Sequence, residues 1–398
     1  MQALAVALAC DASVGGGPAV SARDSAGIDI VESHRPRWSP GDQWRVGAPA
    51  ITIGAALAGN TGQQLDRVVG ATRLSDATIV VADAGARALL RYDASGRYLG
   101  STGRAGDGPG EFRALAWIGR IDGDSIITWD PGLNRMSVFT SSGEYLRDFQ
   151  PATQDLPSDL AVMGRLDGGR LLLIRAERIS LDGNAGVRRL PISGSALSPN
   201  GAEAHMVGPF PGEAVMLKAA ASAGGIIRTS VPFGAATLFA ARGEAVYVID
   251  TEAFELRVYT DEGTLVRIVR WPGTRIAVTP EDVEVFIEER LARVPPIPEI
   301  REGSRRSLEA VPPADTFPAV RGIHVDSEDY IWIEAGRRPA DANARWSIFD
   351  PDGRWLGDLA LPASMTMLEI GTEYVLARSL DDLDVQRVVV MPLDRPRH

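Results

Sequence analysis

A pattern of apolar and polar positions recurs along this chain. Each copy has a short apolar run that ends in an acidic residue, a second run that ends in an aromatic residue, and a glycine four residues later. The acidic residues are Asp83, Asp130, Asp250 and Glu334, the aromatic residues are Tyr92, Phe139, Tyr259 and Phe349, and the glycines are Gly96, Gly143, Gly263 and Gly353. Short apolar runs punctuated by turn residues predict a repeated array of β-hairpins.

Two weaker copies extend the array, with Arg175 and Arg378 in place of the acidic residue. Three of the intervals between copies are close to about 45 residues, which suits one four-stranded blade of a β-propeller. An apolar segment precedes each copy and is predicted to be the innermost strand of its blade. These segments are 65–74, 112–121, 160–166, 236–241, 319–325 and 366–370. The sequence therefore predicts an all-β fold, a six-bladed β-propeller.

The last blade lacks a strand, because only the segment 385–393 follows Arg378 as a strand candidate. We expect segment 28–31 or segment 50–53 to supply the missing outermost strand and so close the ring, which would leave no exposed edge there. Residues 28–398 are then one propeller domain. Residues 1–27 are expected to lie outside it.

One helix is predicted inside the longest interval, over about residues 280–293. Thr279 is a good N-cap, Pro280 suits the first helical position, and Glu281 and Asp282 favour the positive end of the helix. The following segment 295–318 is rich in proline and charge, and we interpret it as a mobile loop.

Composition restricts the function only weakly. The 398 residues are 45% hydrophobic and 23% charged, with a net charge of −11, which is ordinary for a soluble globular protein. A strongly negative surface argues against nucleic-acid binding, because nothing would neutralise phosphates. Lys218 is the one lysine among 41 basic residues, so an enzyme that forms a Schiff base would have to use it.

The beginning of the chain carries a candidate modification site. The residues Ala7, Leu8, Ala9 and Cys10 resemble the cleavage site of a bacterial lipoprotein signal, which would make Cys10 a lipidation site and place the protein in the cell envelope. No lysine or arginine precedes this run, so a disordered cytoplasmic N-terminus is the alternative. No apolar run reaches the length of a transmembrane helix, and contact with a membrane is expected only through such an anchor.

The loop Gly-Asp-Gly-Pro-Gly-Glu-Phe at residues 106–112, together with the four strong copies, resembles the six-bladed β-propellers of NHL-like type. Many members of that group are envelope lipoproteins of unassigned role. The resemblance covers about residues 44–393, and the loop occurs once. It implies a fold and a habit of binding, without a specific reaction.

Candidate sites must be weighed against structural roles. The repeated acidic residues look like a metal ring, but carboxylates after strands accept backbone N–H groups in turns, and one per blade is too widely spaced to share an ion. The four histidines are scattered, whereas propeller lyases and zinc sites need several that converge. None of the five asparagines lies on a predicted innermost strand, which argues against the calcium site of propeller lactonases. No cofactor and no metal are predicted.

Five residues remain as ligand-binding candidates. Arg67, Arg113 and Arg321 stand near the starts of innermost strands, Asp159 is at a similar level, and His324 lies on an innermost strand. Three guanidinium groups at one channel mouth would bind a carboxylate or phosphate. The structural alternative is that each arginine pairs with nearby acids.

Two functional classes follow. The first is a secreted or lipid-anchored binding or scaffold protein, a monomer whose face or channel mouth meets a protein, a glycan or a small anionic ligand. The second is a hydrolase or lyase of the propeller class with an unrecognised channel site. Titratable groups that converge in the channel would favour the enzyme, and isolated paired charges would favour the scaffold.

Overall fold

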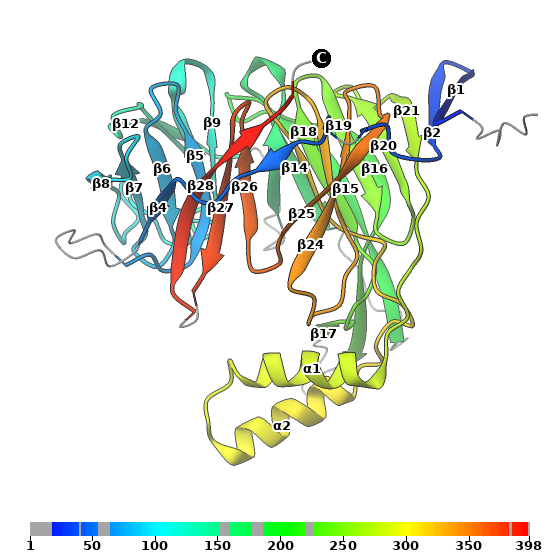
Figure 1. Cartoon of the computed structure of the whole chain (residues 1–398). Coiled ribbons are helices and arrows are strands. Elements are labelled where there is room, and N and C mark those ends of the chain that lie inside the picture. The colour runs from blue at the N-terminus through cyan, green and yellow to red at the C-terminus, as the bar shows by residue number, and fades with distance from the viewer. Residues whose placement is uncertain are drawn as a thin grey trace, which may run out of the picture.

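The described part of the computed structural model comprises residues 18–39, 41–54, 64–151, 160–176, 186–219, 226–381 and 384–396. Its strands divide into six groups, here called blades, and the innermost strands of the blades contact one another in a closed cycle. These strands are β5 (Val68–Arg73), β9 (Trp117–Arg120), β13 (Ala161–Arg165), β18 (Thr237–Arg242), β22 (Val320–Val325) and β26 (Thr366–Ile370). The prediction of an all-β propeller is confirmed (Figure 1).

Within each blade the strands follow one another outward and pair antiparallel. The first two blades continue with β6 (Ile79–Asp83), β7 (Ala88–Tyr92) and β8 (Tyr98–Thr102), and with β10 (Ile126–Asp130), β11 (Arg135–Phe139) and β12 (Tyr145–Phe149). The third continues with β14 (Leu171–Ala176), β15 (Gly186–Leu197), β16 (Glu203–Ala219) and β17 (Ile226–Ser230). A single parallel pair, Gly164 with Ala241, joins the third blade to the fourth.

The remaining blades have the same order. The fourth has β19 (Ala245–Asp250), β20 (Glu255–Thr260) and β21 (Leu265–Arg270), and the fifth has β23 (Ile331–Ala335), β24 (Asn343–Phe349) and β25 (Trp355–Pro362). The sixth has β27 (Tyr374–Leu380) and β28 (Gln386–Asp394). The core lies between neighbouring blades. For example, Trp271 of the fourth blade meets Phe349 of the fifth at a ring-centroid distance of 5.1 Å.

The repeated glycines lie in the tight turn between the third and fourth strands of their blades. Gly96, Gly143, Gly263 and Gly353 have φ values of +83°, +88°, +88° and +86°, which only glycine adopts without cost. Space requires glycine as well, because a Cβ on Gly263 would lie 1.9 Å from the carbonyl oxygen of Met206 in the third blade. The glycine of the repeat is therefore required both by the turn and, at Gly263, by a close contact between blades.

The beginning of the chain adds strands to two blades. Both β3 (Arg45–Val46) and β4 (Ile51–Ile53) pair with β28, the last strand of the sixth blade. The segment around Ile28 has another partner: β2 (Ile28–Ser33) pairs parallel with β21 of the fourth blade, and β1 (Val20–Ser25) pairs with β2. Ordered strands therefore begin before the domain boundary predicted at residue 28.

The insertion between β21 and β22 holds two helices, α1 (Pro280–Leu291) and α2 (Pro298–Glu309). The helix predicted over about residues 280–293 is confirmed as α1, with Thr279 as its N-cap. The segment 295–318, interpreted from the sequence as a mobile loop, instead contains the second helix. A second helix forms because Pro298 occupies its first turn and Glu299 follows at its positive end. The two helices form a hairpin that projects from one end of the ring (Figure 1). No described helix is long and apolar enough to cross a membrane.

Candidate functional site

A cavity of about 730 Å³ lies in the central channel and is lined by residues from the later part of every innermost strand. Apolar side chains form part of its wall, namely Ile118, Val162, Phe239, Ile323 and Leu368, but polar atoms make up the larger share of the exposed lining. Trp117 and Met163 also line it. The cavity is therefore an amphipathic chamber, because charged residues from the ends of these strands surround its mouth.

An arginine ends four successive innermost strands. Arg73 closes β5, Arg120 closes β9, Arg165 closes β13 and Arg242 closes β18. The last three line the channel cavity, whereas Arg73 lies beside it and stacks over the ring of Tyr374 at 4.6 Å. The same residue at the same position of four blades gives one end of the channel a partial ring of guanidinium groups.

Acidic groups share this mouth with the arginines. Arg242 donates to Asp329 at 2.6 Å, and Arg120 donates to Asp124 at 3.4 Å. Arg165 donates to the backbone carbonyl oxygen of Arg120 at 3.2 Å. The side chains of Arg120 and Arg242 are still 38% and 40% exposed, so each keeps donors that face solvent or a ligand.

Glu369 of β26 is held on the opposite wall by three donors. Thr72 donates its hydroxyl at 2.5 Å, the backbone N–H of Arg73 donates at 3.2 Å, and the hydroxyl of Tyr374 donates as well. Burial, followed by the nearby carboxylate, raises the pKa of Tyr374 above its ordinary value. Tyr374 therefore stays protonated near neutral pH, and Glu369 is engaged by neutral donors of its own chain.

His324 of β22 lines the same cavity. Burial lowers its pKa from 6.5 to about 4, so the imidazole is neutral near neutral pH. Its ring lies 5.8 Å from that of Trp346, and it has no hydrogen-bond partner within the described part of the chain. The sequence placed His324 on an innermost strand, and the structure places it in the channel.

The three predicted arginines lie elsewhere. Arg67 and Arg113 precede β5 and β9, and Arg321 is near the beginning of β22, so all three belong to the opposite end of the innermost strands. None of them lines the channel cavity. Arg321 lies 3.8 Å from Glu334, and Arg67 donates to the carbonyl oxygen of Ala84 at 3.2 Å. The arginines predicted from the sequence therefore lie at the starts of the innermost strands, whereas the arginines beside the cavity lie at their ends, where they recur in four successive blades.

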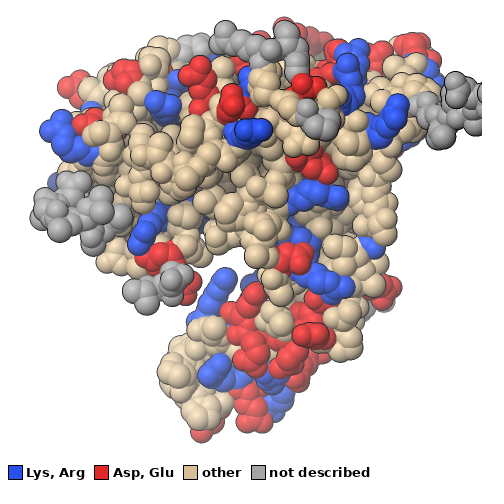
Figure 2. Space-filling model, in the orientation of Figure 1, with Lys and Arg blue, Asp and Glu red and all other residues tan. Residues whose placement is uncertain are grey.

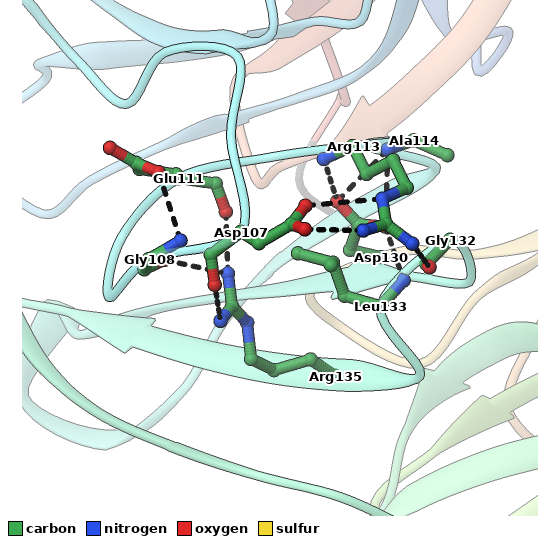
Figure 3. A network of polar contacts seen from close by, with 9 residues as sticks. All are labelled: Asp107, Gly108, Glu111, Arg113, Ala114, Asp130, Gly132, Leu133 and Arg135. Carbon is green, nitrogen blue, oxygen red and sulfur yellow. Dashed lines mark hydrogen bonds and ion pairs between the residues drawn. The ribbon is translucent and has the colours of Figure 1, made fainter.

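Figure 3 shows that Arg113 braces the loop between the first two blades. Its guanidinium pairs with both carboxylate oxygens of Asp107 and also donates to the carbonyl oxygen of Gly132 at 3.2 Å. Arg135 of β11 donates to the carbonyl oxygens of Asp107, Gly108 and Glu111 from the other side. The glycine-rich loop that resembles NHL-like proteins is thus fixed by two arginines.

The repeated acidic residues have two kinds of partner. Asp130 is 1% exposed and accepts the backbone N–H groups of Arg113, Ala114 and Leu133, and Asp83 accepts two such groups in the same way. Asp250 instead pairs with Arg189 at 2.9 Å, and Glu334 pairs with Arg337 at 3.2 Å. All four have structural partners.

Two candidates, Cys10 and Asp159, lie outside the described residues. Among the residues that the structure describes, no group of three or more His, Cys, Asp or Glu side chains is placed to hold a metal ion.

No family model matches this chain, and no curated protein matches it. Solved structures with a similar fold are distant. A candidate exported protein from Bacteroides fragilis is 10% identical, with 92% of this chain and 100% of that chain covered and a TM-score of 0.47.

Two enzymes are similarly distant. Virginiamycin B lyase from Staphylococcus aureus is 10% identical over 88% of this chain and 99% of that chain, with a TM-score of 0.41. A gluconolactonase from Xanthomonas campestris is 14% identical over 90% and 100%, with a TM-score of 0.41. The fold assignment rests on the strand pairing of this chain. Such distant likenesses carry no information about its function.

Proposed function

We propose that this protein is a binding propeller of NHL-like type that takes a small anionic ligand into its central channel. The site is the cavity at the ends of the innermost strands, and Arg120, Arg165 and Arg242 are the residues that hold the anionic group. The observation that carries the proposal is the recurrence of arginine at the last position of four successive innermost strands.

The chemistry of the cavity narrows the ligand class. Guanidinium groups bind carboxylates and phosphates through paired N–H donors. Most of the exposed lining is polar and apolar side chains contribute the rest, which suits a polar ligand with a small apolar part, such as a small organic acid. The acids at the mouth reduce the net positive charge, but Asp329 is already bound by Arg242 and Glu369 by Thr72 and Tyr374. Arg120, Arg165 and Arg242 all line the cavity, and the exposed parts of Arg120 and Arg242 are open to an incoming anion.

We further propose that the protein acts outside the cytoplasm, in the bacterial cell envelope, either secreted or anchored through a lipid on Cys10. The support is the lipoprotein-like run before Cys10. Labelling of cells with a radioactive or clickable fatty acid tests this, and a Cys10→Ser variant that still incorporates the lipid would contradict it.

The binding experiment begins with a thermal-shift screen of small carboxylates and inorganic phosphate, because a ligand of the native state raises the melting temperature. Calorimetric titration of the best ligand then compares three proteins. These are the unmodified chain, the triple variant Arg120→Ala/Arg165→Ala/Arg242→Ala, and the triple variant Arg67→Ala/Arg113→Ala/Arg321→Ala. Both variants remove three positive charges, so they differ only in which end of the channel is altered.

We expect the first triple variant to bind at least about tenfold more weakly, since hydrogen bonds to charged groups contribute about 1.5–3 kcal/mol each. The second variant should bind within about twofold of the unmodified chain. The reverse result would return the site to the arginines predicted from sequence. Equal weakening in both variants would show a general effect of charge and no defined site.

A hydrolase or lyase is the second candidate, favoured by one observation. A neutral histidine without a hydrogen-bond partner, His324, and the carboxylate of Glu369 line the same cavity. A histidine with a pKa of about 4 is a weak base, which is why binding is preferred. Turnover of a lactone or cyclic ester that is lost in both His324→Ala and Glu369→Gln variants would establish the enzyme instead.

A further inference from the structure

A second cavity, of about 1090 Å³, lies away from the channel wall, where the segment around Trp38 and Trp44 crosses the fifth and sixth blades. Tyr330, from the turn between β22 and β23, and Arg395, which follows β28, also line it. With Asp350 and Thr372, residues from five separate segments of the described chain line this chamber. The proposed function does not use it.

Aromatic rings line one side of the cavity. The ring centroids of Trp38 and Trp44 are 5.7 Å apart, and those of Trp44 and Tyr330 are 4.8 Å apart. Trp44 is anchored in the core, with 6% of its surface exposed, and its ring lies 5.8 Å from that of Trp332. Trp38 and Tyr330 are only partly buried. The rings are thus fixed from behind and present part of their surface to the cavity.

One cation already occupies part of this aromatic surface. The guanidinium of Arg395 lies 4.5 Å from the centroid of the Trp44 ring and 5.4 Å from that of Tyr330. It also pairs with Asp326 at 2.9 Å and with Glu328 at 2.5 Å. The arrangement shows that the ring faces and nearby carboxylates of this chamber accommodate a flat organic cation.

The charges that line the cavity are unbalanced. Five carboxylates and two guanidiniums line it. Both guanidiniums already form ion pairs, Arg395 with Glu328 and Arg37 with Asp350 at 3.6 Å. Asp42, Glu373 and Asp394 have no Lys or Arg within ion-pair distance in the described part of the chain. Three unneutralised carboxylates beside aromatic faces create an attractive field for positive charge and a repulsive one for anions.

We propose that this chamber binds a small organic cation with ammonium or guanidinium groups. Its charged groups would meet Asp42, Glu373 and Asp394 at the rim. One of them would lie against the exposed face of Trp38, as cations do over tryptophan in aromatic cages. This ligand class is opposite in charge to that proposed for the channel, so the two sites are distinguishable in one set of experiments.

The test is calorimetric titration of the intact chain with spermidine and with agmatine at low ionic strength, with maltose as a neutral polyhydroxyl probe and calcium chloride as an inorganic cation. The cavity variant is Asp42→Asn/Glu373→Gln/Asp394→Asn. The matched control is Glu281→Gln/Glu289→Gln/Glu302→Gln on the helical hairpin, which changes the net charge by the same amount far from the cavity. Trp38→Ala and Trp38→Phe test the aromatic face.

We expect spermidine or agmatine to bind and to lose about tenfold or more in affinity in the cavity variant, with little change in the matched control. Trp38→Ala should weaken binding about threefold to tenfold, and Trp38→Phe should recover most of the loss, because both rings attract cations. Circular dichroism of each variant verifies that the ring is folded before its affinity is interpreted.

Three results would overturn the proposal. Equal weakening in the cavity variant and in the hairpin control would mean that only net charge attracts the cation. Tighter binding of calcium, unaffected by Trp38→Ala, would mean a carboxylate ion site in which the rings have no part. Binding of maltose in preference to both organic cations would identify a carbohydrate site.

Discussion

Single carboxylates at strand ends fix the loops and turns within a blade, and Asp130 is the clearest case. Its buried carboxylate accepts three backbone N–H groups at 2.7 to 3.1 Å. Asp130→Asn replaces one acceptor oxygen by an NH₂ group that faces these donors, so we expect the free energy of unfolding to fall by about 1–3 kcal/mol. Asp250→Asn is the control. Because Asp250 is 37% exposed, this substitution should lower the free energy of unfolding by less. Urea unfolding measures both, and equal losses would refute the role given to Asp130.

His324 predicts how stability depends on pH. Its pKa is about 4 in the folded chain against 6.5 for the ordinary side chain, so between these values the unfolded chain binds the proton that the folded chain excludes. Stability is therefore lost as the pH falls through this window, by about 2–3 kcal/mol at pH 4.5. His324→Phe should lack that part of the loss. Urea unfolding at pH 7 and 4.5 measures the difference, and parallel losses in both proteins would contradict the lowered pKa of His324.

At the scale of elements, the short strand β4 stabilises the ring out of proportion to its length. It pairs with residues 388–390 of β28, and Ile53 is 1% exposed against the first and sixth blades. Deletion of residues 1–55 should therefore lower the melting temperature severely, since it leaves β28 as an open edge. Deletion of residues 1–34 removes β1 and β2 but keeps this pairing, and it should cost much less. Similar melting temperatures for the two truncations would show that β4 is dispensable.

The innermost strands were predictable because alternating apolar runs and turn residues are local signals. The segment 366–370 coincides with β26, and 319–325 begins one residue before β22. The second helix was not predictable from the sequence, because the proline and charged residues of 295–318 also suit a loop. In addition, α2 packs on α1 without burying a residue of its own, so it has no strong apolar pattern. The position of the channel cavity could not be predicted for another reason: which end of an innermost strand meets a cavity depends on how six blades pack, and no single repeat encodes it.

At the scale of the whole molecule, the ring and the helical hairpin are separable. Hydrogen bonds from Val278 to Asp315 and from Phe317 to Ile276 join the two ends of the insertion, so a short turn could replace everything between them. In Figure 2 the hairpin carries interspersed acidic and basic residues, and on one side a hollow lies between it and the ring. The hairpin contacts the ring through α1, where the ring of Phe286 lies 5.3 Å from that of Phe233. The end of α2 also contacts the ring, because Lys218 donates to the carbonyl oxygen of Ala310 at 3.3 Å and Val311 is buried against the third blade.

Replacing residues 280–313 by about four glycine and serine residues, enough for a tight connection, should therefore leave a folded propeller. We expect a loss of about 2–4 kcal/mol, because the deletion removes Phe286, which packs on Phe233, and the buried Val311, so their partners on the ring would meet water. Channel affinity should be unchanged, since the arginine mouth lies at the other end of the innermost strands. Thermal unfolding followed by circular dichroism, with titration of the channel ligand, measures both. A chain without cooperative unfolding would mean that the hairpin belongs to the core of the ring, and altered affinity would mean that the channel is open to the hairpin's side.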